Sequence, residues 1–173
     1  MTNSVILVDE FDNMIGTMQK MQAHRFGKLH RAFSVFIFND KGELLLQQRA
    51  FDKYHSGGKW TNTCCSHPLP GEKTIDAANR RLDEEMGMKC ELHYAFNFTY
   101  KADLKNGISE HEYDHVYLGI SETEPLPEPG EVAAFKYVNT EVLAKELYTY
   151  PEQYTEWLKI CFDRVMENYH QMF

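Results

Sequence analysis

Residues 64–67, Cys-Cys-Ser-His, bring two thiols and an imidazole together within one short stretch. Residues two apart on an extended segment share a face, so Cys65 and His67 could act as a nucleophile and its base. A metal-binding module would need a further ligand pair at zinc-finger spacing, whereas Cys90 and Cys161 are isolated in the sequence. Neighbouring cysteines are badly placed to bond to each other, and four cysteines in 173 residues favour reduced thiols. A Cys–His hydrolase, a zinc-binding interaction module and packing therefore remain as interpretations of this stretch alone.

Two carboxylates and three imidazoles form a second set of candidate chemical groups. Glu110 and Glu112 lie two apart in a segment that we expect to be extended, so both point to one face. Carboxylates side by side repel each other unless a proton or a cation lies between them. With His24, His30 and His67 they could hold a borderline transition metal, Zn²⁺ or Mn²⁺. Because a single histidine is more often a hydrogen-bonded surface residue, this hypothesis requires all five side chains to come together.

A predicted helix over residues 74–86 carries the third pattern. Thr74 can cap its start, an apolar stripe follows one face, and Gly87 can end it. Glu72, followed after seven residues by Arg-Arg-Leu-Asp-Glu-Glu-Met-Gly-Met at 80–88, is similar to the Nudix box, a signature of diphosphate-processing enzymes.

Two positions depart from that box. Ser66 stands where the box begins with glycine, and Arg81 stands where it has a second glutamate. A cation in place of a carboxylate favours binding a phosphate over cutting it, while Glu85, four residues further along the same helix face, can still bind a divalent cation. The alternative interpretation of these charges is a solvated acidic helix face.

The elements that must position these groups can be expected from the chain pattern. Two hairpins, at 5–18 and 33–48, precede a long loop at 50–71; strands at 92–101, 111–120 and 134–138 and a helical tail broken near Pro151 follow the helix. In the tail, Trp157 begins an apolar series at spacings of four. This order predicts an α+β fold, a mixed β-sheet with flanking helices, in a single domain over residues 1–173.

Composition limits the partners. The formal charge is -8 and the acidic residues are dispersed, which argues against a nucleic-acid-binding surface. No apolar run approaches the roughly 20 residues that cross a bilayer, so we expect no membrane partner, a chain that starts at or near Met1, and a cytoplasmic location. We further expect a monomer or a weak dimer.

Five motifs, taken in order, resemble one family. AHRFGKLHRAFS, QQRAFDK, WTNTCCSHP, the modified box and EHE run from about residue 20 to 118 and are similar to type I isopentenyl-diphosphate isomerases, a metal-dependent Nudix-fold branch of isoprenoid biosynthesis. The resemblance implies a Nudix-like α/β/α sandwich. It also implies interconversion of isopentenyl diphosphate and dimethylallyl diphosphate through a tertiary carbocation, with one proton added and another removed. A Nudix diphosphohydrolase is the alternative.

The resemblance assigns roles residue by residue. It implies Cys65, Glu112 and Tyr100 as catalytic residues, and gives Cys64 no catalytic role. It also implies that the substrate is bound by Lys20, Arg49, Lys53, Arg81 and Trp157. The implied metal ligands are His24, His30, His67, Glu110 and Glu112 for Zn²⁺ or Mn²⁺, and Glu85 for a Mg²⁺ that bridges to the diphosphate.

Overall fold

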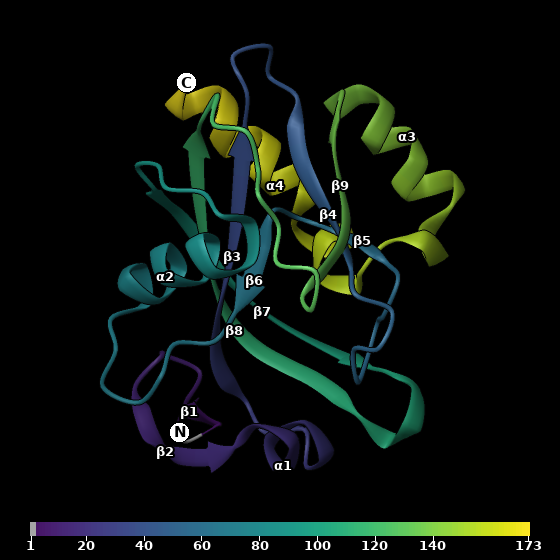
Figure 1. The fold of residues 1–173 in the computed structure, drawn as a ribbon. Coiled ribbons are helices and arrows are strands. Elements are labelled where there is room, and N and C mark those ends of the chain that lie inside the picture. Colours follow the sequence, from purple (N-terminus) through teal and green to yellow (C-terminus); the bar gives the residue numbers. More distant parts are fainter. Residues whose placement is uncertain (1–2) are drawn as a thin grey trace.

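Nine strands form one mixed sheet in the computed structural model, which describes residues 3–173 (Figure 1). Helix α2 covers one face of the sheet, and α3 and α4 cover the other (Figure 1). This arrangement confirms the predicted α+β fold with flanking helices. The elements, in chain order, are β1 (Ser4–Val8), β2 (Met14–Gln19), α1 (Lys20–Arg25), β3 (His30–Phe38), β4 (Leu44–Arg49), β5 (Trp60–Thr61), β6 (Cys64–Ser66), α2 (Thr74–Met86), β7 (His93–Asp103), β8 (Ser109–Ile120), β9 (Val132–Val138), α3 (Thr140–Thr149) and α4 (Glu156–Met172), with single 3₁₀ turns at Lys105–Gly107 and Pro151–Gln153.

Strand β3 is the centre of the sheet. It pairs in parallel with β8 along its whole length, from His30 opposite Glu112 to Phe38 opposite Ile120, and antiparallel with β1 and β6. Strand β7 extends the sheet beyond β8, and β9 extends it beyond β4. The central position of β3 holds segments that are distant in the sequence side by side.

The predicted hairpin over 33–48 is only partly correct. Its turn forms as expected, with Gly42 at a φ of 72°, but β3 and β4 pair only at Phe38 and Leu44. The strands then diverge because β3 pairs with β6 and β8, whereas β4 pairs with β5 and β9. The two strands therefore form a hairpin only next to the turn.

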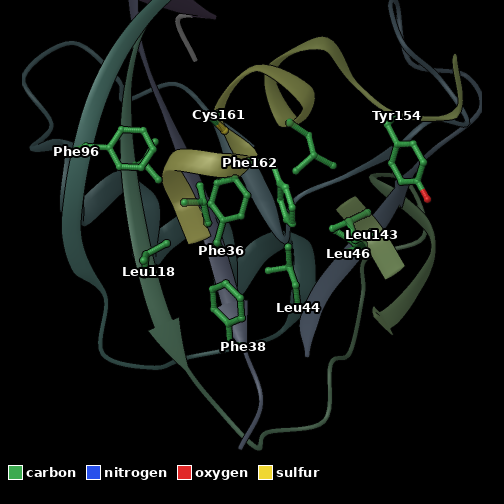
Figure 2. Close-up of a cluster of buried hydrophobic side chains, with 13 residues drawn as sticks. Phe36, Phe38, Leu44, Leu46, Phe96, Leu118, Leu143, Tyr154, Cys161 and Phe162 are labelled. Atoms are coloured by element: carbon green, nitrogen blue, oxygen red, sulfur yellow. The ribbon is translucent and has the colours of Figure 1, made fainter. Parts of the chain in front are cut away.

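Alternation along β3 supplies both apolar cores. Phe33, Val35 and Ile37 face α2, whereas Phe36 and Phe38 face α4. Figure 2 shows the second core, where Phe162 of α4 lies against the phenyl rings of β3. Full burial of each such side chain stabilises the fold by about 1.5–3 kcal/mol, so the sheet is a rigid support on both faces.

The prediction of a loop over 50–71 is wrong for the segment 60–66, which contains β5 and β6. The polar side chains of Thr61, Asn62 and Thr63 are buried, and distant backbone groups satisfy two of them. The Asn62 amide donates to the Val35 carbonyl at 3.1 Å, and the Thr63 hydroxyl donates to the Leu45 carbonyl at 2.7 Å. Hydrogen bonds across the sheet thus allow a polar run to enter the core.

Helix α2 ends as predicted but begins differently. Gly87 ends it in the left-handed region at a φ of 62°, where a Cβ would lie 2.7 Å from the Leu126 carbonyl oxygen. The expected Thr74 cap is wrong, since Lys73 occupies the cap position and no side chain there bonds to the helix. The short helix α1 was not predicted.

The C-terminal segment forms two helices separated near Pro151, as predicted. Trp157, Cys161 and Val165 of α4 are buried, which confirms the apolar series. Among residues 3–173, none of the helices has both the length and the apolar character needed to span a bilayer.

Candidate active site and metal centre

The candidate site begins where the apolar half of one sheet face ends. On β8, Val116 and Leu118 belong to the core under α4, and the residues that continue the same face by alternation are Glu110, Glu112 and Asp114, all buried. Residues of the opposite parity point away, as expected: the His111 ring bonds to the backbone carbonyl of residue 27 at 2.9 Å. The regular strand therefore delivers three carboxyl groups to one side of the sheet.

Histidines converge on these carboxyl groups from three other segments. His24 comes from α1, His30 begins β3 directly opposite Glu112, and His67 follows β6. One potential ligand atom from each of His24, His30, His67 and Glu110 lies within 4.8 Å of the others. Four predicted metal ligands are thus brought together.

The fifth predicted ligand, Glu112, lies beside this cluster. Its Oε1 is 2.9 Å from His67 Nε2 and 3.6 Å from His30 Nε2, and its Oε2 accepts a hydrogen bond from the Tyr100 hydroxyl at 2.7 Å. Burial by itself would raise the pKa of Glu112, but the adjacent imidazoles of His30 and His67 hold it well below its usual range. Burial and the neighbouring Glu112 charge raise the pKa of Glu110.

The hydrogen bonds of the histidines favour cation binding. His30 Nδ1 donates to the Lys28 carbonyl at 2.8 Å, which leaves the lone pair on Nε2, only 3.2 Å from His67 Nε2. Burial lowers the pKa of His24 to about 3 and that of His67 to about 4, so both rings are neutral, the form that binds metals.

Two buried atoms of the cluster lack a hydrogen-bond partner, His24 Nδ1 and Glu110 Oε2. Such atoms are costly unless something else satisfies them. Nitrogen and carboxylate donors at this spacing suit a divalent cation of the Zn²⁺ or Mn²⁺ type. The residues present therefore fit a bound metal ion.

The two adjacent cysteines of β6 lie on opposite faces of the sheet. Cys64 is opposite Val35 of β3 and is fully buried in the core under α2. Cys65 is opposite Ser34, on the other face, and lines the pocket that also contains Glu112. Burial raises the pKa of the Cys65 thiol, so it holds its proton at neutral pH. Both thiols are free.

Four cationic side chains line the same pocket. Arg81 of α2 bonds to Glu85 Oε1 at 2.7 Å, and the second oxygen of Glu85 accepts from the Gln47 amide at 2.9 Å. Glu131 pairs with Lys53 and lies 3.4 Å from Arg81. The four predicted cations come from α1, β4, the loop after it and α2, and they are Lys20, Arg49, Lys53 and Arg81.

Trp157, in the first turn of α4, forms one wall of the pocket. Its indole N–H donates to Asn62 at 3.0 Å, and the Arg49 guanidinium lies 5.5 Å from its ring centroid. The empty space of the pocket, including its open mouth, is about 580 Å³. It is lined by Lys20, Arg49, Lys53, Tyr54, His55, Cys65, Ser66, His67, Arg81, Glu85, Tyr100, Glu110, Glu112, Glu131 and Trp157.

The structure thus places every predicted site residue in or directly beside one pocket, with His24 and His30 behind its wall. Sequence reasoning missed Tyr54, His55, Gln47 and Glu131. The Tyr54 hydroxyl lies 3.0 Å from His24 Nε2, and His55 Nε2 lies 2.6 Å from Glu110 Oε1. The available signal was a tyrosine–histidine pair inside a loop too long to be a simple connection.

Comparison with known proteins connects this geometry to a family. The NUDIX domain model matches residues 28–158. The chain is 50% identical to the isopentenyl-diphosphate Delta-isomerase of Pectobacterium atrosepticum, over 98% of this chain and 94% of the relative. It is 51% identical to isopentenyl-diphosphate Delta-isomerase 1 of Aromatoleum aromaticum, over 96% of this chain and 94% of the relative.

Solved structures share the fold at much lower identity. The Deinococcus radiodurans protein DR0079 superposes with a TM-score of 0.79 at 19% identity, over 93% of this chain and 98% of that one. A MutT protein from Methanosarcina mazei gives a TM-score of 0.65 at 20% identity, over 79% and 91% of the two chains. These similarities show the fold alone.

Proposed function

The chain belongs to the NUDIX domain family and, within it, to the isopentenyl-diphosphate Delta-isomerases, and from this premise we propose that it interconverts isopentenyl diphosphate and dimethylallyl diphosphate. At the level of residues, the proposal rests on the groups that the pocket brings together. A thiol from β6, Cys65, and a carboxylate from β8, Glu112, share one pocket, with imidazoles beside the carboxylate and four cationic side chains in the same lining. This combination of groups matches a substrate with a hydrocarbon part and a diphosphate part.

The reaction moves a double bond and needs one acid and one base. A proton added to one end of the alkene gives a tertiary carbocation, and a proton removed from the neighbouring carbon gives the isomer, so atoms and charge balance. Cys65 and Glu112 are the proposed pair, because they reach the pocket from different strands and can stand on either side of a flat alkene. Which of them is the acid in each direction is left to experiment. The Tyr100 hydroxyl bonds to Glu112 at 2.7 Å and would orient that carboxyl group.

The carbocation must be kept from water. Trp157 and Tyr100 are 3% and 5% exposed, and their aromatic faces can stabilise a desolvated cation by about 2 kcal/mol each. The wall that they form excludes the nucleophiles that would otherwise capture the intermediate.

The diphosphate end requires positive charge on a chain with net charge -8. Arg49, Lys53, Arg81 and Lys20 would supply it, since all four line the same pocket. Glu85 would hold a Mg²⁺ that bridges to the diphosphate oxygens.

For the imidazole cluster we propose Zn²⁺ or Mn²⁺, held by His24, His30, His67, Glu110 and Glu112. When bound, such an ion would make the carboxyl group of Glu112 a stronger acid. We further propose a monomer or weak dimer in the cytoplasm, with no nucleic-acid or membrane partner.

The test is direct. Metal-replete protein incubated with isopentenyl diphosphate and Mg²⁺ should form an acid-labile allylic product, and absence of product would refute the proposal. Release of phosphate from nucleoside diphosphate derivatives would favour a diphosphohydrolase, which the isomerase relatives and Arg81 argue against.

The order of proton transfer has its own experiment. Isotope uptake from heavy water in single turnovers of Cys65→Ala and Glu112→Gln should show each variant losing a different exchange step. Equal loss of both steps in both variants would contradict separate roles.

A further inference from the structure

His55, in the loop between β4 and β5, lies against the candidate metal centre. Its side chain is 6% exposed, and its Nε2 is 2.6 Å from Glu110 Oε1. The other ring nitrogen, Nδ1, is 3.2 Å from the Ser56 hydroxyl, which can donate to it. With Nδ1 accepting, the ring proton is on Nε2 and is donated to the carboxylate.

The loop backbone is built to turn this ring inward. Ser56 has a φ of 51° and Gly58 a φ of 76°, both in the left-handed region that ordinary side chains disfavour. A Cβ at residue 57, which is glycine, would lie 2.6 Å from the Phe51 carbonyl oxygen. An unfavourable conformation at Ser56 persists only where the surroundings hold it in place, and the bond from Ser56 to His55 is part of that support.

Three different parts of the pocket meet at His55. Its side chain bonds to Glu110, a candidate metal ligand; its ring lies edge-on to Trp157, with centroids 6.0 Å apart; and its carbonyl accepts from the Arg49 guanidinium at 3.2 Å. One residue therefore connects the metal cluster, the tryptophan wall and one of the cations proposed to bind the diphosphate.

We propose that His55 is a positioning residue of the metal centre, which fixes the orientation of Glu110 through its Nε2 proton and links that orientation to Trp157 and Arg49. The inference rests on the proposed function, because it takes Glu110 as a ligand. Carboxylate ligands are generally held by such outer hydrogen bonds, and loss of one typically weakens metal binding by about 10–100-fold.

The experiment compares His55→Ala and His55→Gln with His93→Ala, which removes a partly exposed histidine from β7, away from the pocket. Co²⁺ affinity is measured by competition with a chelator, the Co²⁺ visible spectrum reports the geometry of the ligands, and kcat and KM are measured at saturating metal. We expect His55→Ala to bind Co²⁺ about 10–100-fold more weakly with a shifted spectrum. His55→Gln, whose amide can still donate to Glu110, should recover much of the affinity, and His93→Ala should match the unmodified protein.

Unchanged Co²⁺ affinity and spectrum in His55→Ala would overturn the proposal, and so would a loss of kcat without loss of affinity. Circular dichroism of the metal-free variants reports whether they fold, and if His55→Ala does not, His55→Gln against His93→Ala decides the outcome. Failure of the proposed function is separately visible, because the unmodified protein would then form no allylic product even if its Co²⁺ affinity depends on His55.

Discussion

Two halves of the same sheet face have opposite characters. Toward one end of β3 and β8, Phe36, which is labelled in Figure 2, and Val116 are fully buried in the core under α4. Toward the other end, at positions of the same parity, His30 and Glu112 are opposite each other and border the pocket. The backbone pairing is continuous through both halves, so the difference lies in the side chains and in what covers them. A rigid core and a reactive pocket can thus share one pair of strands, with the first turn of α4 at the boundary.

The largest effect on activity is expected from removing the reactive groups of the polar half. Cys65→Ala and Glu112→Gln should each lower kcat by about 10²–10⁴-fold, because each removes a proton donor or acceptor, while the thermal midpoint changes little. Isomerase assays and thermal melts check this.

Cys64→Ala is the matched control, since it deletes the neighbouring thiol from the core under α2. It should cost about 1 kcal/mol of stability and leave kcat nearly unchanged. If Cys64→Ala lost as much activity as Cys65→Ala, the assignment of the two faces would be wrong.

The apolar half should respond in the opposite way. Phe36→Ala should lower the free energy of unfolding by about 3–5 kcal/mol, because a fully buried ring is replaced by a cavity. Urea unfolding measures the loss, and the folded fraction at low temperature should keep most of its kcat. A stable but inactive Phe36→Ala variant would show that the two halves are not separable.

The buried histidines lie beside the polar half, so proton binding gives a further test of how that half differs from the apolar half. Burial lowers the pKa of His24 to about 3 and of His67 to about 4, whereas an unfolded histidine titrates near 6.5. At these two histidines the unfolded chain therefore binds more protons below pH 6.5, so their contribution to the stability of the metal-free protein is complete above that pH and is lost as the pH falls toward 4.

From these two histidines we expect a loss of about 2 kcal/mol or more between pH 7.5 and pH 5 in chelator-treated protein, while the raised pKa of Glu110 acts in the opposite direction. Denaturant titrations at both pH values measure it, with metal-loaded protein as the comparison. Loading should move the loss to lower pH because a bound ion keeps its ligands deprotonated. An equal pH dependence in both forms would argue against a metal at these histidines.

The smallest effect is expected at the mouth of the pocket. Arg81→Gln should raise KM about tenfold, because it removes roughly one charge-assisted hydrogen bond to the diphosphate. The value of kcat should stay within a few-fold of that of the unmodified protein. Arg80→Gln is the control, because Arg80 pairs with Glu72 and does not line the pocket. If Arg80→Gln raised KM tenfold and Arg81→Gln did not, the diphosphate would not bind at Arg81.

Regular periodicity made much of the fold predictable. The alternation of Glu110 and Glu112 predicted a shared face, and the apolar stripe with Gly87 predicted the extent of α2. Local patterns of this kind are set by neighbouring residues and can be read without tertiary contacts.

The features that escaped prediction depend on distant partners. Asn62 and Thr63 enter the sheet because carbonyl groups of β3 and β4 accept their hydrogen bonds. Helix α1 has only six residues, too few for a periodic signal. His55 turns inward through a local backbone conformation at Ser56, which neither composition nor spacing reveals.

The parallel pairing of β3 with β8 has a consequence for how the protein is made. His30 meets Glu112 across a long stretch of intervening chain, and Trp157 comes later still. Parallel strands so far apart in sequence can pair only after the segment between them has been synthesised. A growing chain on the ribosome therefore cannot offer its full ligand set to a cation until residue 112 has emerged, and the pocket gains its tryptophan wall only after residue 157 has followed.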